Sequence, residues 1–147
     1  MYRNLTKGLY LMNNDPVITY KFREIKNVIS SYLIQVLPQF HISPIMMYAL
    51  EFLRKHPDCI AVDIANEFGL TRGAITQLLD KLEEQGLVVR KPHPTSRRSL
   101  LIQVTDKGNH LINEILDAYH QKIEQLFIPY TAEELSVLKK LLEKLPL

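Results

Sequence analysis

The hydrophobic period of the chain changes near its centre, and this change constrains the fold more than any other feature. Residues 72–85 carry apolar side chains at helical spacing, whereas 87–89 and 100–104 are aliphatic and β-branched runs. A polar, turn-rich segment separates the two runs, so they are predicted to pair as a β-hairpin. The short segment 62–68, which Gly69 ends, is predicted to be a further helix. The order short helix, turn, helix, hairpin is typical of a helix-turn-helix with a β-wing.

Capping residues delimit the helices of this central region. Thr71 is predicted to cap helix 72–85, and Gly86 to end it. Ser43 followed by Pro44 is typical of a helix start, and we expect that helix to run to about residue 55.

Long helices are predicted at both ends of the chain. The first covers 16–40, with Asp15 as a candidate cap, and the second covers about 106–128 after the cap Thr105. A capping box at 131–134 opens a last helix. The apolar positions of the first helix are Ile18, Phe22, Ile25, Ile29, Tyr32 and Val36. One small winged helix could not bury such wide faces, so we expect a homodimer; the alternative is packing within one chain.

The predicted fold class is therefore mainly α with a small β-hairpin wing: a winged helix-turn-helix plus N- and C-terminal dimerisation helices. The 147 residues suffice for one intertwined domain. Within it we expect an N-terminal dimerisation region (1–42), a DNA-binding lobe (43–105) and C-terminal helices that complete the dimerisation region (106–147).

The positive charge is concentrated in the central segment. The whole chain has a formal net charge of only +2, but residues 71–105 alone carry six basic and three acidic side chains. Within 86–104 there are four basic residues and no acidic one. Such asymmetry favours a polyanionic partner, and the alternative is a solvated basic loop.

The exposed face of helix 72–85 is predicted to read DNA in the major groove. Thr76 and Gln77 are the candidates for contacts to base edges, and Arg72 for a base or a phosphate. Gly73 lets the backbone approach a phosphate closely. An arginine pair in the wing can enter the minor groove, and Arg90 can meet phosphates. The full set of candidate DNA-binding residues is Arg72, Gly73, Thr76, Gln77, Lys81, Arg90, Arg97 and Arg98.

Residues 63–108 resemble the winged helix-turn-helix of MarR-family transcriptional regulators. The resemblance rests on the helix exit Leu78, Leu82, Gly86, Leu87 and Arg90, and on the segment Val104-Thr105-Asp106-Lys107-Gly108. It implies a homodimer that binds a palindromic operator in double-stranded DNA and acts as a repressor relieved by a small molecule or an oxidant. The family's wing carries Asp-x-Arg, and Ser96 replaces the acid here. Either Arg98 is then more mobile, or another group holds it.

Effector binding is predicted only through the resemblance, which places effectors between the dimer helices and the DNA-binding lobe. The aromatic residues that could line such a crevice are Tyr20, Tyr32, Phe40, Tyr48 and Phe52. The alternative is that these rings belong to the core.

Other functions are less well supported by the sequence. Cys59 lies near His56 and Asp58, so a redox sensor is one hypothesis and a small buried residue is the other. No phosphate loop, nucleophile motif or metal-ligand cluster is found, so we expect no enzyme, no cofactor and no metal. With no secretory signal, no membrane-spanning run and a single cysteine, the chain is expected in the cytoplasm. The alternative function is a winged helix protein-interaction module without DNA binding.

Overall fold

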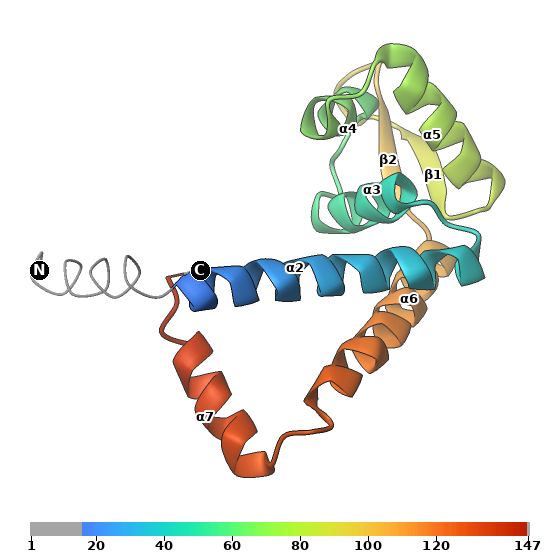
Figure 1. The fold of residues 1–147 in the computed structure, drawn as a ribbon. Coiled ribbons are helices and arrows are strands. Elements are labelled where there is room, and N and C mark those ends of the chain that lie inside the picture. The colour runs from blue at the N-terminus through green and yellow to red at the C-terminus, as the bar shows by residue number, and fades with distance from the viewer. Residues whose placement is uncertain (1–15, 147) are drawn as a thin grey trace, which may run out of the picture.

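Helices and a single hairpin follow one another along residues 16–146, which are the residues that the computed structural model describes (Figure 1). In chain order they are α2 (Pro16–Val36), η1 (Leu37–Phe40), α3 (Pro44–Lys55), α4 (Ala61–Phe68), α5 (Arg72–Glu84), β1 (Val88–Pro92), β2 (Leu100–Val104), α6 (Asp106–Glu124), η2 (Gln125–Phe127) and α7 (Ala132–Leu142). This order confirms the fold class predicted from the sequence. The candidate cap Asp15 and the N-terminal segment considered for a secretory signal lie outside the described residues.

The predicted caps make the hydrogen bonds that start the helices. The Ser43 hydroxyl accepts from the Met46 amide, and the Thr71 hydroxyl accepts from the Ala74 amide at 3.2 Å. Thr105 caps α6 in the same way. The capping box that opens α7 is also present. Each hydroxyl satisfies an amide that has no partner within its own helix, which explains why these helices begin where the sequence predicts.

Prolines shorten the two long helices relative to the prediction. The helix expected over 16–40 is α-helical only to Val36, and the rest is the 3-10 helix η1, which contains Pro38. The helix expected over 106–128 likewise ends at Glu124 and continues as η2 before Pro129. A proline lacks an amide hydrogen and its ring clashes with the carbonyl four residues earlier, so the α-helical ladder cannot continue through it.

The hairpin is longer on its first strand than predicted, because β1 extends to Pro92. The strands pair antiparallel with Val88 opposite Val104 and Pro92 opposite Leu100. A further bridge joins Ile60 to Leu101, on the other edge of β2. The hairpin is therefore attached to the segment before α4 through β2.

The core lies in the lobe formed by α3, α4, α5, the hairpin and the start of α6 (Figure 1). Helix α5 contributes its predicted inward face, and Leu82 on that face is fully buried. Met47, Leu50 and Ile64 contribute from α3 and α4. This core holds α5 and the wing side by side on one end of the molecule.

Helices α2 and α7 leave most of their apolar side chains uncovered. Helix α7 buries none of its residues, and α2 buries only Val36. In Figure 1, α2, α6 and α7 extend away from the lobe. The exposed large hydrophobic residues of this region are Val17, Ile18, Tyr20, Phe22, Ile25, Val28, Ile34, Phe127, Ile128, Tyr130, Val137, Leu141, Leu142 and Leu145.

Across residues 16–146, no helix taken alone has the length and apolar character needed to cross a membrane. The segments Pro16–Phe40 and Pro44–Lys55 meet that criterion only as a pair, and they are bent by 94° at the break between them.

Candidate nucleic-acid interface

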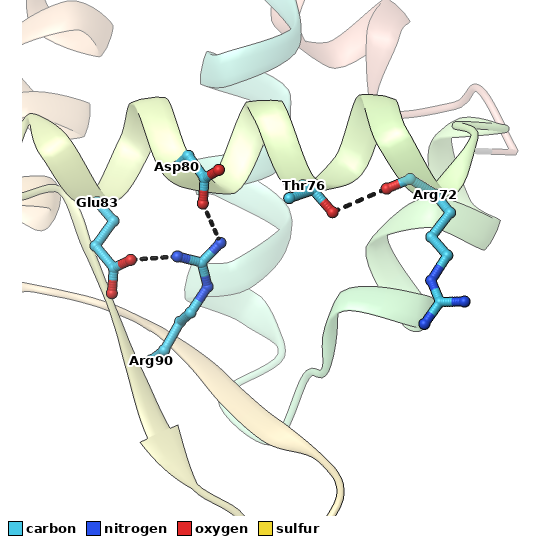
Figure 2. A network of polar contacts seen from close by, with 5 residues as sticks. All are labelled: Arg72, Thr76, Asp80, Glu83 and Arg90. Atoms are coloured by element: carbon cyan, nitrogen blue, oxygen red, sulfur yellow. Dashed lines mark hydrogen bonds and ion pairs between the residues drawn. The ribbon is translucent and has the colours of Figure 1, made fainter.

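Helix α5 presents one polar face to solvent. Arg72, Gly73, Thr76, Gln77 and Lys81 are all exposed on it, as the helical spacing predicts. The Thr76 hydroxyl donates to the Arg72 carbonyl at 2.9 Å (Figure 2). Because this bond uses the hydroxyl proton, Thr76 offers an outside partner its methyl group and an acceptor oxygen.

A groove of about 620 Å³ lies where α5, the wing and the start of α4 meet, next to the two elements that the sequence assigns to DNA. Arg72 and Thr76 line it from the helix, and Arg98 lines it from the wing loop. The structure thus brings together four predicted site residues from two elements, because Arg90 of the wing lines the same groove. Gln77 and Lys81 are exposed on α5 without being among the residues that line this groove, and Arg97 is exposed in the loop.

Gly73 lies where a backbone could be approached closely. A Cβ atom added at Gly73 would meet nothing within 4 Å, so the space next to this first turn of α5 is open. This openness is compatible with the predicted approach of a phosphate to the helix N-terminus.

The wing loop is held by its own serines. The Ser96 hydroxyl donates to the Ser99 hydroxyl at 3.2 Å, and the His93 amide donates to the Ser99 carbonyl. Within residues 16–146, no hydrogen bond or ion pair involves the side chains of Arg97 and Arg98. Among the described residues, neither Ser96 nor an acid holds Arg98, so the alternative that another group holds it gains no support.

Arg90, which the sequence predicts to meet phosphates, is paired within the protein. One of its guanidinium nitrogens donates to Asp80 at 2.7 Å and the other donates to Glu83 (Figure 2). Its side chain is only 23% exposed. The hydrogen bond to Asp80, with further contributions from Glu83, raises the pKa of Arg90. The structure pairs this charge internally, between β1 and α5, although Arg90 also lines the groove. Its contact with a phosphate stays a prediction.

The sequence reasoning missed the roles of Asp80 and Glu83, although a signal was present. Acids three residues apart share one helix face. Arg90 follows them across the tight turn at Gly86, which adopts φ 71°. An acidic pair on a helix, followed by a turn and a basic strand residue, can indicate such a pairing.

Cys59 does not have the surroundings of a reactive thiol. It is 5% exposed, and burial raises the pKa of its thiol to about 11, with a further contribution from Asp63. A thiol that stays protonated is a poor nucleophile. The structure therefore favours the second hypothesis for Cys59, a small buried residue. Among residues 16–146, no three His, Cys, Asp or Glu side chains are grouped so that they could hold a metal ion.

The five aromatic candidates for effector binding have different surroundings. Phe40 and Phe52 pack against the core, and Phe52 also stacks on His56. Tyr20 and Tyr48 are exposed on α2 and α3, and Lys122 lies over the ring of Tyr32. For Phe40 and Phe52 the structure supports the alternative of core packing, and effector binding by the other rings stays a prediction.

Comparison with known proteins identifies the lobe that contains this groove. The family model described as "MarR family" matches residues 42–99. The HTH-type transcriptional regulator MhqR of Bacillus subtilis (strain 168) is 31% identical over 106 residues, which cover 72% of the chain and 73% of that protein. The chain belongs to the MarR family. It is a winged helix transcriptional regulator, and the resemblance seen in residues 63–108 is thereby confirmed.

Solved structures show the same fold along nearly the whole MarR-family chain. The transcriptional regulator Tm0710 from Thermotoga maritima has a TM-score of 0.80 at 22% identity, covering 88% of this chain and 92% of that one. A point mutant of MepR from S. aureus, solved bound to an oligodeoxyribonucleotide, has a TM-score of 0.73 at 25% identity, covering 87% and 94%. At these coverages the likeness extends well beyond residues 42–99, which the family model matches.

Proposed function

We propose that this MarR-family regulator is a homodimeric repressor that binds a palindromic operator in double-stranded DNA. The observation that carries the proposal is the groove between α5 and the wing, with Arg72 on one side and Arg98 on the other. Two positively charged side chains that face the same groove from separate elements favour a polyanionic partner such as the phosphate backbone of DNA. The oligodeoxyribonucleotide bound to the MepR mutant supports this choice of partner.

The predicted contacts divide into base contacts and backbone contacts. We assign the reading of base edges to Thr76 and Gln77, and phosphate or guanine contacts to Arg72. Lys81 and the open N-terminal turn at Gly73 meet phosphates, and the wing arginines enter the minor groove. Arg90 leaves this set because its charge is paired within the protein.

The exposed apolar faces of α2 and α7 support the dimer. Patches of this extent on a monomer mark an interface, and a two-fold interface would present two copies of α5 to half-sites about one helical turn apart. We therefore propose the division expected from the sequence: dimerisation regions at 1–42 and 106–147, and a DNA-binding lobe at 43–105.

Relief of repression is assigned to a small molecule rather than to oxidation of Cys59, since that thiol is buried and protonated. The effector would shift the population of dimers toward a spacing of the two α5 helices that does not fit the operator. A regulator of this kind acts where the DNA is, so we propose a cytoplasmic location.

The test is a random-site selection with the full chain, followed by affinity measurements on the selected duplex over a salt series. If a dimer neutralises about six to ten phosphates, the logarithm of the affinity falls with the logarithm of salt at about −0.9 per phosphate. A flat salt response, or no preference for any duplex, would contradict DNA recognition and favour the alternative of a protein-interaction module.

A further inference from the structure

We infer that Arg90 is a positioning residue, which fixes the wing relative to α5 and so sets the operator preference without touching DNA. This inference rests on the proposed function, since the readout that it concerns is DNA recognition. It also assigns a role to Asp80 and Glu83, whose carboxylates on α5 accept the hydrogen bonds of Arg90.

The geometry of the pairing restrains the wing in more than one direction. Arg90 lies on β1, opposite Ile102 of β2. Its two terminal nitrogens reach Asp80 and Glu83, which lie on successive turns of α5 (Figure 2). A planar guanidinium that donates to two separate carboxylates fixes its own orientation as well as its distance. With only 23% of the side chain exposed, solvent screens the pairing less than it screens a surface ion pair.

The attachment of β1 makes this restraint effective. Strand β2 is joined on its other edge to Ile60, and the Ile102 amide donates to the Cys59 carbonyl at 2.8 Å. Strand β1 has β2 as its single strand partner in the described sheet. Arg90 therefore links the outer strand of the wing to the helix beside it. Arg98 lies in the loop beyond the last pair of the hairpin. A small rotation of β1 at Arg90 therefore displaces this loop by a larger distance than it displaces Arg90 itself.

The pairing also removes an electrostatic penalty from the reading helix. The side chains of Asp80 and Glu83 are 50% and 40% exposed, on the same helix as Arg72 and Thr76. Unpaired carboxylates at these positions would repel a phosphate backbone close to α5. The Arg90 guanidinium compensates part of that charge, and the two carboxylates engage both of its terminal nitrogens.

The decisive variant is Asp80→Ala/Glu83→Ala, because two interpretations predict opposite effects. If Arg90 were a DNA contact, its release from the two acids would raise operator affinity. If Arg90 positions the wing, binding to random duplex rises with the added positive charge, while the preference for the operator falls about tenfold. The matched control is Glu67→Ala/Glu84→Ala, which removes the same charge from exposed sites on α4 and α5. This control is expected to raise affinity for both duplexes equally.

A second variant, Arg90→Gln, is compared with Arg98→Ala over the salt series. Loss of the Arg98 charge, which neutralises phosphates from within the minor groove, reduces the salt slope by about 0.9 for each phosphate no longer neutralised. Arg90→Gln is expected to lower the operator preference by about the same tenfold factor with the slope unchanged. A slope reduced as much as in Arg98→Ala would overturn the inference.

A readout without DNA separates this inference from the proposed function. In the free protein, hydrogen exchange at the amides of 93–99 is expected to speed up in Asp80→Ala/Glu83→Ala and Arg90→Gln but not in Glu67→Ala/Glu84→Ala. Unchanged hydrogen exchange in both Asp80→Ala/Glu83→Ala and Arg90→Gln would overturn the positioning role of Arg90. If the unmodified protein selects no duplex, the proposed function fails while the exchange measurement still decides whether Arg90 holds the wing.

Discussion

Arg90 and Arg98 belong to the same hairpin and carry the same charge, yet their neighbours give them different tasks. Both line the groove, but Arg90 meets two carboxylates of α5, whereas Arg98 meets none. An arginine without an internal partner keeps its donors for an external anion. At the scale of single residues, the acids nearby decide which basic side chains are free to bind DNA.

Thr76 gives a prediction that separates its methyl group from its hydroxyl. The hydroxyl proton is donated to the Arg72 carbonyl, so the methyl is the group that can contact a thymine methyl. Thr76→Val keeps the methyl, and we expect it to retain operator affinity. Thr76→Ser removes the methyl and is expected to cost about 1 kcal/mol at one base position. Binding to operators with single-base changes checks this, and equal losses in both variants would contradict it.

Cys59 gives a prediction about pH. Burial first, and then Asp63, raises the pKa of its thiol from 9.0 to about 11. Because the neutral thiol is favoured in the folded state, its contribution to stability is complete below pH 9 and is lost as the pH rises toward 11. At pH 8 we expect alkylation of the folded protein to be about 100-fold slower than that of the unfolded chain.

The control for this prediction is Cys59→Ala, in which alkylation and the associated loss of stability between pH 9 and 11 both disappear. Rapid alkylation of the native protein at neutral pH would restore the redox-sensor hypothesis.

At the scale of elements, the start of α6 is joined firmly to the end of α5. The Thr105 hydroxyl donates to the Gly86 carbonyl at 2.6 Å, and the Lys107 ammonium donates to the Gln85 carbonyl at 2.7 Å. A Cβ atom at Gly108 would lie 2.3 Å from the Leu87 carbonyl oxygen, so the two backbones approach closely there. The end of α5 and the start of the long helix α6 are therefore held against each other at this joint.

Two glycine substitutions test this joint and the open site at Gly73. Gly108→Ala is expected to destabilise the protein by about 1–3 kcal/mol, because the new methyl meets a backbone oxygen. Gly73→Ala meets nothing within 4 Å, and we expect it to stabilise α5 by about 1 kcal/mol while weakening DNA binding. Urea unfolding measures the stability of both variants, and binding to the operator duplex measures the affinity of Gly73→Ala. If both variants changed the free energy of unfolding equally, the close backbone contact at Gly108 would be contradicted. Unchanged operator affinity in Gly73→Ala would contradict the phosphate approach at Gly73.

At the scale of the whole molecule, one end is packed and the other is not. The lobe around α5 has a closed core, whereas the apolar side chains of α2 and α7 remain uncovered. A groove of about 630 Å³ between η2 and α7 is lined by Phe127, Leu135, Leu138 and Leu142. This distribution favours a second copy at the uncovered end, which leaves both α5 helices free.

Charges placed on these faces are expected to dissociate the dimer. Phe22→Glu and Leu141→Glu each put a carboxylate into a surface that the partner would have to desolvate, so the dimer dissociation constant rises on the order of tenfold or more. Sedimentation equilibrium measures this. Val62→Glu, at an exposed apolar position of the lobe, is the control and should leave the dimer intact. An unchanged dimer in both interface variants would place the interface elsewhere.

The sequence alone determined the elements and their order, because caps, helix stops and hydrophobic period act over a few neighbouring residues. Thr71, Gly86 and the inward face of α5 could all be predicted in this way. Only the tertiary structure decided which charges are free. The pairing of Arg90 with Asp80 and Glu83, and the open groove between Arg72 and Arg98, depend on how a strand and a helix meet in space. Local pattern sets the type of an element, whereas the burial and pairing of its side chains depend on neighbours that are distant along the chain.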